Sequence, residues 1–106
     1  PEQTVLSGAT DEVAAAEKAF AAQGVRTVRL PVGAAFHSPH VATAEGPFRD
    51  AIASVAIRPG GRVFANTTGG EYPEEAASLL AGQLARPVEW ARQVEAMYNA
   101  GARTFL

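Results

Sequence analysis

The sequence predicts an α/β fold, and two observations carry this prediction. Short runs rich in β-branched residues, such as residues 25–32 (VRTVRLPV), alternate along the chain with longer Ala-rich runs, such as residues 11–23 (DEVAAAEKAFAAQ). Gly or Pro lies at many of the boundaries between these runs, as expected where a strand or a helix ends. Strands that alternate with helices in this way are typical of α/β domains.

The first third of the chain predicts a strand, a helix and a second strand. A short strand is expected around residues 5–6, and a helix over 11–23 with Thr10 as its N-cap and two acidic residues in its first turn. Gly24 is expected to end this helix in the left-handed conformation. The alternation of residues over 25–32 then predicts the second strand.

The rest of the chain continues the alternation. Pro47 removes a backbone donor and should bend or restart a helix, whereas Pro87 suits the first turn of one. The expected elements are a helix over 41–57, a turn at 58–61, a strand over 62–66, a loop over 67–73, helices over 74–84 and 87–101, and a strand-like segment over 103–106.

Composition excludes several classes of function. The chain has 106 residues, of which 47% are hydrophobic and 19% charged, with a net charge of −2, so nothing suggests nucleic acid or an anionic membrane as a partner. It has no cysteine, and no apolar run approaches the roughly 20 residues of a membrane-spanning helix. We expect a cytoplasmic protein that is either one small domain or part of a larger one.

His37 is the strongest candidate for chemistry. It lies in the stretch AAFHSPH (34–40), directly after a predicted strand, where catalytic residues often collect. It could be a general base, a metal ligand together with His40, or a packed or surface histidine. Zinc needs three or four ligands, and the nearby acids Glu45 and Asp50 lack a matching spacing, so no metal site is expected.

A catalytic base would also need a nucleophile. No G-x-S-x-G sequence, the pattern of a nucleophilic serine on a tight strand–helix turn, occurs in the chain. A serine for His37 to activate would therefore lie outside these residues.

Three motifs in fixed order resemble one enzyme family. They are AFHSP (35–39), FANTTG (64–69) and the Q-L-x-x-P-V-x-W run (83–90). The chain resembles the C-terminal half of malonyl-CoA:acyl-carrier-protein transacylases and of polyketide synthase acyltransferase domains. The resemblance implies that residues 1–32 belong to a ferredoxin-like small subdomain, and that 33–106 belong to an α/β-hydrolase-like large subdomain.

The resemblance also implies roles for single residues. His37 matches the family's catalytic histidine, and Gln83 matches the glutamine whose main-chain carbonyl orients that imidazole. Asn66 matches a recurrent position, to which we assign only a scaffolding role, because its side chain could equally cap the turn that begins at Thr67. The family's nucleophilic serine and carboxylate-binding arginine lie upstream, so we expect this chain to be part of a longer acyltransferase domain.

The implied reaction transfers a malonyl group from malonyl-CoA to the phosphopantetheine thiol of an acyl carrier protein, through an acyl-serine, in polyketide or fatty acid synthesis. No bound metal or redox cofactor is expected. The expected partners are the acyl carrier protein, the N-terminal part of the same domain and adjacent synthase domains. The alternative is a non-catalytic α/β docking or binding module derived from an acyltransferase.

The residues before His37 suggest the acyl group. In the polyketide branch of the family, malonyl-selective domains resemble HAFH here and methylmalonyl-selective domains resemble YASH. Ala34, Ala35 and Phe36 with His37 match the malonyl pattern at three of four places and depart at Ala34. Phe36 is expected to occupy the space that an α-methyl group would need, unless its ring only packs in the core.

Overall fold

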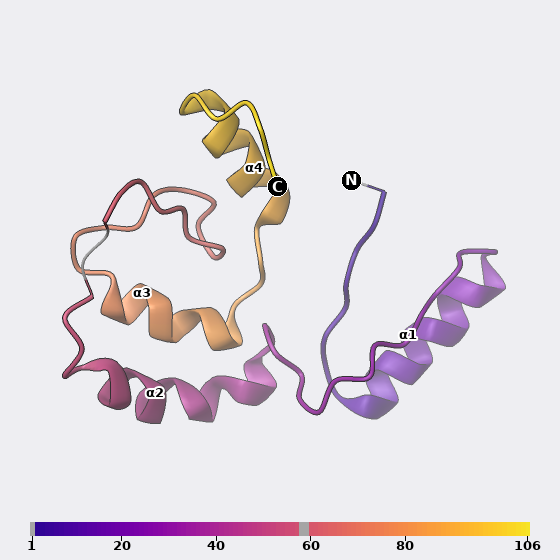
Figure 1. Cartoon of the computed structure of the whole chain (residues 1–106). Helices are drawn as coiled ribbons and strands as arrows, with labels where there is room; N and C mark the ends of the chain where they lie inside the picture. The colour runs from indigo at the N-terminus through magenta and orange to yellow at the C-terminus, as the bar shows by residue number, and fades with distance from the viewer. Residues whose placement is uncertain (1, 58–59) are drawn as a thin grey trace.

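The computed structural model describes residues 2–57 and 60–106, and its regular structure is helical (Figure 1). The predicted turn at 58–61 has its first two residues outside the described ones. The described residues form four α-helices and two short 3-10 helices, in the order α1 (Thr10–Ala22), η1 (Pro39–Ala44), α2 (Glu45–Ile52), α3 (Ala77–Gly82), η2 (Gln83–Ala85) and α4 (Trp90–Asn99).

Helix α1 lies where it was predicted, but its first turn differs in one residue. Ala9 occupies the N-cap position and Thr10 is already helical, so the prediction of Thr10 as N-cap is wrong. The carboxylate of Glu12 accepts from the backbone N–H of Ala9 at 3.3 Å, which supplies a side-chain cap from inside the helix. Gly24 has φ 73°, and its N–H bonds back to the last turn at 3.0 Å, so the predicted glycine end is confirmed.

The segments predicted as strands do not form a sheet in the described residues. The β pairing there is a single antiparallel bridge between Phe64 and Glu71. A strand needs a neighbouring strand to satisfy its backbone N–H and C=O groups. Residues 5–6, 25–32 and 103–106 have no such neighbour among the described residues, and their apolar side chains are exposed, for example Val28 at 73%.

Residues 62–72 form a short hairpin, named here the 62–72 hairpin. The N–H of Tyr72 donates to the carbonyl of Val63 at 2.8 Å, and the N–H of Ala65 donates to the carbonyl of Gly70 at 2.7 Å. Gly69, at the tip, has φ 68°. The predicted strand over 62–66 is thus one arm of a hairpin whose other arm was predicted as loop.

Helices α2, α3 and α4 begin at other residues than predicted; α3 begins at Ala77 instead of Glu74, and the other two begin near prolines. After η1, helix α2 begins at Glu45, so Pro47 falls in its first turn, where the missing N–H has no helical acceptor. Helix α4 begins at Trp90 instead of Pro87, with Glu89 as its N-cap. In both cases proline lies near the helix start but does not set the first residue.

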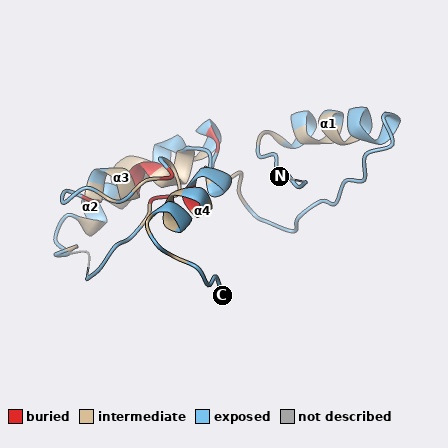
Figure 2. Cartoon of the chain, turned by 90° about the horizontal axis from the view of Figure 1, so that it is seen from above, coloured by how far each residue is buried: buried red, intermediate tan, exposed pale blue. Residues whose placement is uncertain are grey.

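The molecule is flat, and its core is small. Its extents are 47 × 37 × 18 Å and its radius of gyration is 16.5 Å, against about 13 Å for a compact domain of about 100 residues. Figure 2 shows that buried residues lie in the part that holds α2, α3 and α4, whereas α1 projects away. The buried apolar residues are Ala65, Ala76 and Ala81, and no large side chain is fully buried among the described residues.

The packing of the helices brings η1 and η2 into contact. Helices α2 and α3 pack side by side, and the 3-10 helices that adjoin them, η1 and η2, are also in contact. His37 shortly precedes η1, and Gln83 is the first residue of η2.

In the described residues, no helix has both the length and the apolar character that a membrane span requires.

Candidate active site

His37 occupies a strained turn just before η1. Its φ is 62°, which makes it the non-glycine residue with a left-handed backbone among those the structure describes. Such a conformation costs about 1–2 kcal/mol for an L-residue, so neighbouring contacts must hold it. The N–H of His37 donates to the carbonyl of Leu84 at 2.8 Å, and the hydroxyl of the buried Ser38 donates to the carbonyl of Ala35 at 2.7 Å.

The imidazole of His37 is held from η2. Its Nδ1 lies 3.0 Å from the main-chain oxygen of Gln83. A carbonyl oxygen can only accept a hydrogen bond, so Nδ1 carries the proton and Nε2 is the basic nitrogen of the neutral ring. His37 is exposed, which leaves the ring accessible to other groups.

The two accepting carbonyls are available because of how η2 ends. The last carbonyls of a helix have no partner within it. After Ala85 the chain becomes extended, with Arg86 at φ −110° and ψ 148°, so η2 does not continue. The carbonyls of Gln83 and Leu84 therefore remain free to accept from the ring and the backbone of His37.

The side chain of Gln83 makes a separate contact. Its Nε2 donates to the hydroxyl oxygen of Tyr72, on the second arm of the 62–72 hairpin. Tyr72 is half-buried, and burial raises the pKa of its phenol, an effect that the hydrogen bond from Gln83 partly offsets. The phenol therefore stays protonated at neutral pH.

The residues expected to select the acyl group lie directly beside His37. Ala34 and Ala35 are half-buried, and Phe36 is 51% exposed. Within this chain, Phe36 is thus not enclosed by a core.

His40 lies apart from the contacts of His37. Its Nε2 is 3.8 Å from the carboxylate of Glu12 in α1, and both side chains are exposed. Among residues 2–57 and 60–106, no three His, Cys, Asp or Glu side chains gather as metal ligands would.

Asn66 connects the hairpin to α4 through its main chain. Its carbonyl accepts from the N–H of Glu89 at 2.7 Å, which fixes the start of α4. The turn that begins at Thr67 is capped by Thr68, whose Oγ1 accepts from the N–H of Gly70 at 3.2 Å. The structure therefore joins Asn66 to α4 and not to His37.

Three side chains that support this region were missed in the sequence. Tyr72 carries no local signal, because it lies in a Gly- and Pro-containing loop. Gln93 is 6% exposed, and its Nε2 donates to the carbonyl of Phe64 at 2.7 Å. The only sequence signal for Arg62 is its charge opposite to that of Glu71, and it could be used only if the hairpin had been predicted.

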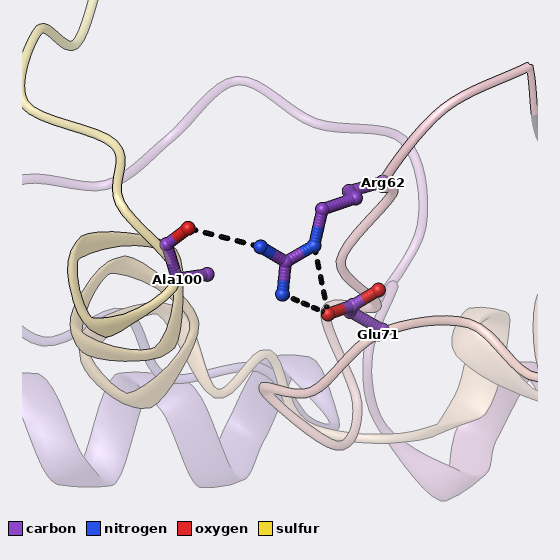
Figure 3. Close-up of polar contacts among 3 residues, drawn as sticks. All are labelled: Arg62, Glu71 and Ala100. Atoms are coloured by element: carbon purple, nitrogen blue, oxygen red, sulfur yellow. Dashed lines mark hydrogen bonds and ion pairs between the residues drawn. The ribbon is translucent and has the colours of Figure 1, made fainter.

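Arg62 ties the hairpin to the end of α4 (Figure 3). Its guanidinium donates to the carboxylate of Glu71, with Nε at 3.0 Å, and to the carbonyl of Ala100 at 2.9 Å. Ala100 is the C-cap of α4, where a cation is favourable. The hydrogen bonds between the two side chains lower the pKa of Glu71 and raise the pKa of Arg62.

Comparison with known proteins identifies relatives among fatty acid and polyketide biosynthesis proteins and transacylases, although no family model matches the chain. The chain is 33% identical over 109 residues to a polyunsaturated fatty acid synthase component of Thraustochytrium sp., with all of the chain covered. It is 36% identical over 108 residues to the polyketide biosynthesis protein ThaF of Burkholderia thailandensis, with 99% covered. It is also 35% identical over 77 residues to a probable mitochondrial malonyl-CoA-acyl carrier protein transacylase of Drosophila melanogaster, with 70% covered.

The comparison with solved structures finds a protein of the same kind as the Drosophila relative. The malonyl CoA-acyl carrier protein transacylase of Clostridium perfringens matches 84% of the chain with a TM-score of 0.75 and 28% identity. This similarity is consistent with the predicted α/β class. The chain is a homologue of these synthase proteins and transacylases, and the resemblance carried by its three motifs is confirmed.

The chain corresponds to a small part of each of these proteins. It spans 4% of the fatty acid synthase component, 9% of ThaF, 20% of the Drosophila transacylase and 29% of the Clostridium chain.

Proposed function

We propose that this chain supplies the acid–base side of an acyltransferase active site, with His37 as the catalytic histidine. The reaction moves a malonyl group from malonyl-CoA to the phosphopantetheine thiol of an acyl carrier protein. The observation that supports this role is the 3.0 Å contact between Nδ1 of His37 and the main-chain oxygen of Gln83. It sets the tautomer in which Nε2 can accept a proton.

In the first half-reaction, a serine from outside these residues attacks the thioester carbonyl of malonyl-CoA. Nε2 of His37 accepts the serine proton, and the resulting imidazolium donates this proton to the departing CoA thiolate. In the second half-reaction, Nε2 accepts the proton of the pantetheine thiol as this thiol attacks the acyl-serine. The proton then passes to the serine oxygen that leaves.

The main-chain oxygen of Gln83 takes the place of a carboxylate in this scheme. It accepts from Nδ1–H both when the ring is neutral and when it is protonated, so it orients the imidazole throughout. As a neutral group it stabilises the imidazolium less than an aspartate would, which favours prompt return of the proton.

The remaining assignments follow the same family relationship. Residues 1–32 would belong to the small ferredoxin-like subdomain and 33–106 to the large α/β-hydrolase-like subdomain. The exposed apolar segments and small core support a body that packs against further parts of an acyltransferase, including the segment with the serine and adjacent synthase domains. Asn66 would act as scaffold by holding the hairpin to the start of α4.

Malonyl is proposed as the preferred acyl group because of Phe36. Its ring lies next to His37 in sequence and is half-exposed, so it is available to line a pocket for the group that reacts there. A ring at this position would oppose an α-methyl substituent and leave malonyl unaffected.

The test is transfer of labelled malonyl from malonyl-CoA to an acyl carrier protein by the complete protein that carries this chain. His37→Ala should lower the rate by about 10²-fold to 10⁴-fold, the usual contribution of a positioned acid–base group. His40→Ala is the matched control, because His40 is an exposed histidine nearby, and it should leave the rate unchanged. Normal acyl-enzyme formation in His37→Ala would refute the role of His37, whereas no transfer by the wild-type protein would favour a non-catalytic docking module.

A further inference from the structure

Gln83 makes two contacts that point in different directions. Its main-chain oxygen lies 3.0 Å from Nδ1 of His37, and its side-chain amide donates to the hydroxyl of Tyr72. One residue thus links a tyrosine on the 62–72 hairpin to the imidazole of the candidate site. The peptide oxygen of Gln83 can orient the ring only if Gln83 itself is held.

The helix that contains Gln83 is poorly suited to hold it. Element η2 comprises Gln83, Leu84 and Ala85 alone, and the 3-10 helix has weaker hydrogen-bond geometry than the α-helix. Gln83 is also the C-cap of α3, where its N–H donates to the carbonyls of Leu80 and Ala81. The contact of its side chain with Tyr72 adds an anchor from outside these two helices, which helps to fix the direction of the Gln83 carbonyl.

Tyr72 is fixed independently of Gln83. Its N–H donates to the carbonyl of Val63 at 2.8 Å, which places it in register on the hairpin. The hairpin is held in turn by α4, where the buried Gln93 donates to the carbonyl of Phe64 at 2.7 Å. The hydroxyl of Tyr72 is thus a preset anchor to which the Gln83 side chain binds.

We propose that Tyr72 is a positioning residue for acyl transfer, which acts through Gln83 on the orientation of His37. The inference rests on the proposed function of His37. A phenol is protonated at neutral pH, and burial raises the pKa of Tyr72 further, so the hydroxyl oxygen is a neutral acceptor for the Gln83 amide.

The first test is Tyr72→Phe in the complete protein, which removes the hydroxyl and keeps the ring. The kcat for malonyl transfer should fall about 3-fold to 10-fold, as expected for one lost hydrogen bond, with the KM for malonyl-CoA unchanged. Tyr98→Phe is the matched control, because Tyr98 is exposed and its ring contacts Arg103. It should change neither constant.

A double-mutant cycle separates this chain of contacts from general damage to the fold. Gln83→Met keeps the length of the side chain and the main-chain carbonyl but removes the donor to Tyr72. If the two residues act through one contact, Tyr72→Phe combined with Gln83→Met should be no worse than the more damaging single change. Losses that simply add would overturn the proposal.

The second readout is the imidazole itself. Nitrogen NMR of ¹⁵N-histidine-labelled protein, with the His37 signal assigned by its loss in His37→Ala, should show Nδ1 protonated in the wild type. Tyr72→Phe should shift the ring nitrogens toward a mixture of tautomers. Unchanged shifts would overturn the role of Tyr72, even where His37→Ala abolishes transfer. Full transfer by His37→Ala would instead overturn the proposed function, and the nitrogen shifts would still decide whether Tyr72 orients the ring.

Discussion

The backbone amide of His37 donates to the carbonyl of Leu84 at 2.8 Å, one residue beyond the carbonyl that meets its ring. Two successive carbonyls of η2 therefore hold the same histidine, one by its backbone and one by its imidazole. The backbone contact supports a left-handed φ of 62°, and the ring contact sets the tautomer. These two functions can be separated by substitution.

His37→Asn should abolish most activity without damage to the turn. Asparagine tolerates the left-handed backbone better than alanine does, but its amide cannot act as a general acid or base at neutral pH. Malonyl transfer should fall about 10²-fold to 10⁴-fold, while the urea midpoint of the complete protein stays near that of the wild type. A variant that is inactive only because it is unfolded would fail the second measurement.

Gln83→Ala should be milder than His37→Ala. The oxygen that meets the imidazole belongs to the main chain and survives the change, whereas the contact with Tyr72 is lost. We expect a loss of about 10-fold in kcat, the scale of one hydrogen bond. Equal losses for Gln83→Ala and His37→Ala, with the fold intact, would show that the Gln83 side chain acts directly in the reaction.

Phe36→Ser should narrow the preference for malonyl over methylmalonyl. The wild-type protein should favour malonyl in kcat/KM, because discrimination over one carbon is typically worth about 1–3 kcal/mol in an apolar pocket. The ratio is measured with both CoA esters in competition. Phe20→Ser, which removes an exposed phenylalanine of α1, is the control and should leave the ratio as it was. An equal or reversed preference in the wild type would refute the choice of malonyl as the acyl group, but not the proposed acyl transfer.

Gly69→Ala should destabilise the hairpin. A Cβ at Gly69 would lie 2.8 Å from the Cβ of Arg92, and its φ of 68° disfavours any L-side chain. We expect a loss of about 1–3 kcal/mol in the free energy of unfolding, measured with urea. Gly70→Ala is the control, since a Cβ there would meet only the Thr68 hydroxyl at 3.9 Å. Equal stability of the two variants would mean that α4 moves away from the hairpin at no cost.

The ion pair of Arg62 and Glu71 should give a small pH-dependent contribution to stability. Hydrogen bonds from Arg62 lower the pKa of Glu71 below its ordinary value of 4.5. A lowered pKa means that the contribution is present above pH 4.5 and is lost as the pH falls through the value in the folded state. Urea midpoints of wild type and Glu71→Gln should therefore differ slightly at pH 7 and converge in acid. A difference that persists at about pH 2, well below the ordinary range of carboxyl groups, would contradict this sign.

The sequence predicts those features of the fold that depend only on neighbouring residues. The acidic first turn of α1 and its glycine end at Gly24 need only neighbouring residues, and α1 lies where the sequence predicts it. The start of α4 depends on a distant residue instead, because Glu89 donates to the carbonyl of Asn66. This explains why Pro87 was a poor guide to the first helical residue.

Pairing between distant residues could not be predicted from periodicity. The apolar alternation of residues 25–32 describes a surface that suits a sheet, but not the strand that would complete it. His37 and Gln83 are separated by 46 positions, and their pairing was expected only through the family resemblance. Tyr72 was missed because its role depends on the register of a hairpin, which a glycine-containing loop sequence does not reveal.

The exposed alternating segment at 25–32 also affects how the polypeptide behaves in concentrated solution. Apolar side chains such as Val28, at 73% exposure, lie beside backbone groups that can pair with a strand of another molecule. Arg26 and Arg29 interrupt this segment, and their like charges repel the same residues of a second copy. Salt screens this repulsion beyond about 10 Å at about 0.1 M, so self-association of the isolated chain should increase with ionic strength as well as with concentration.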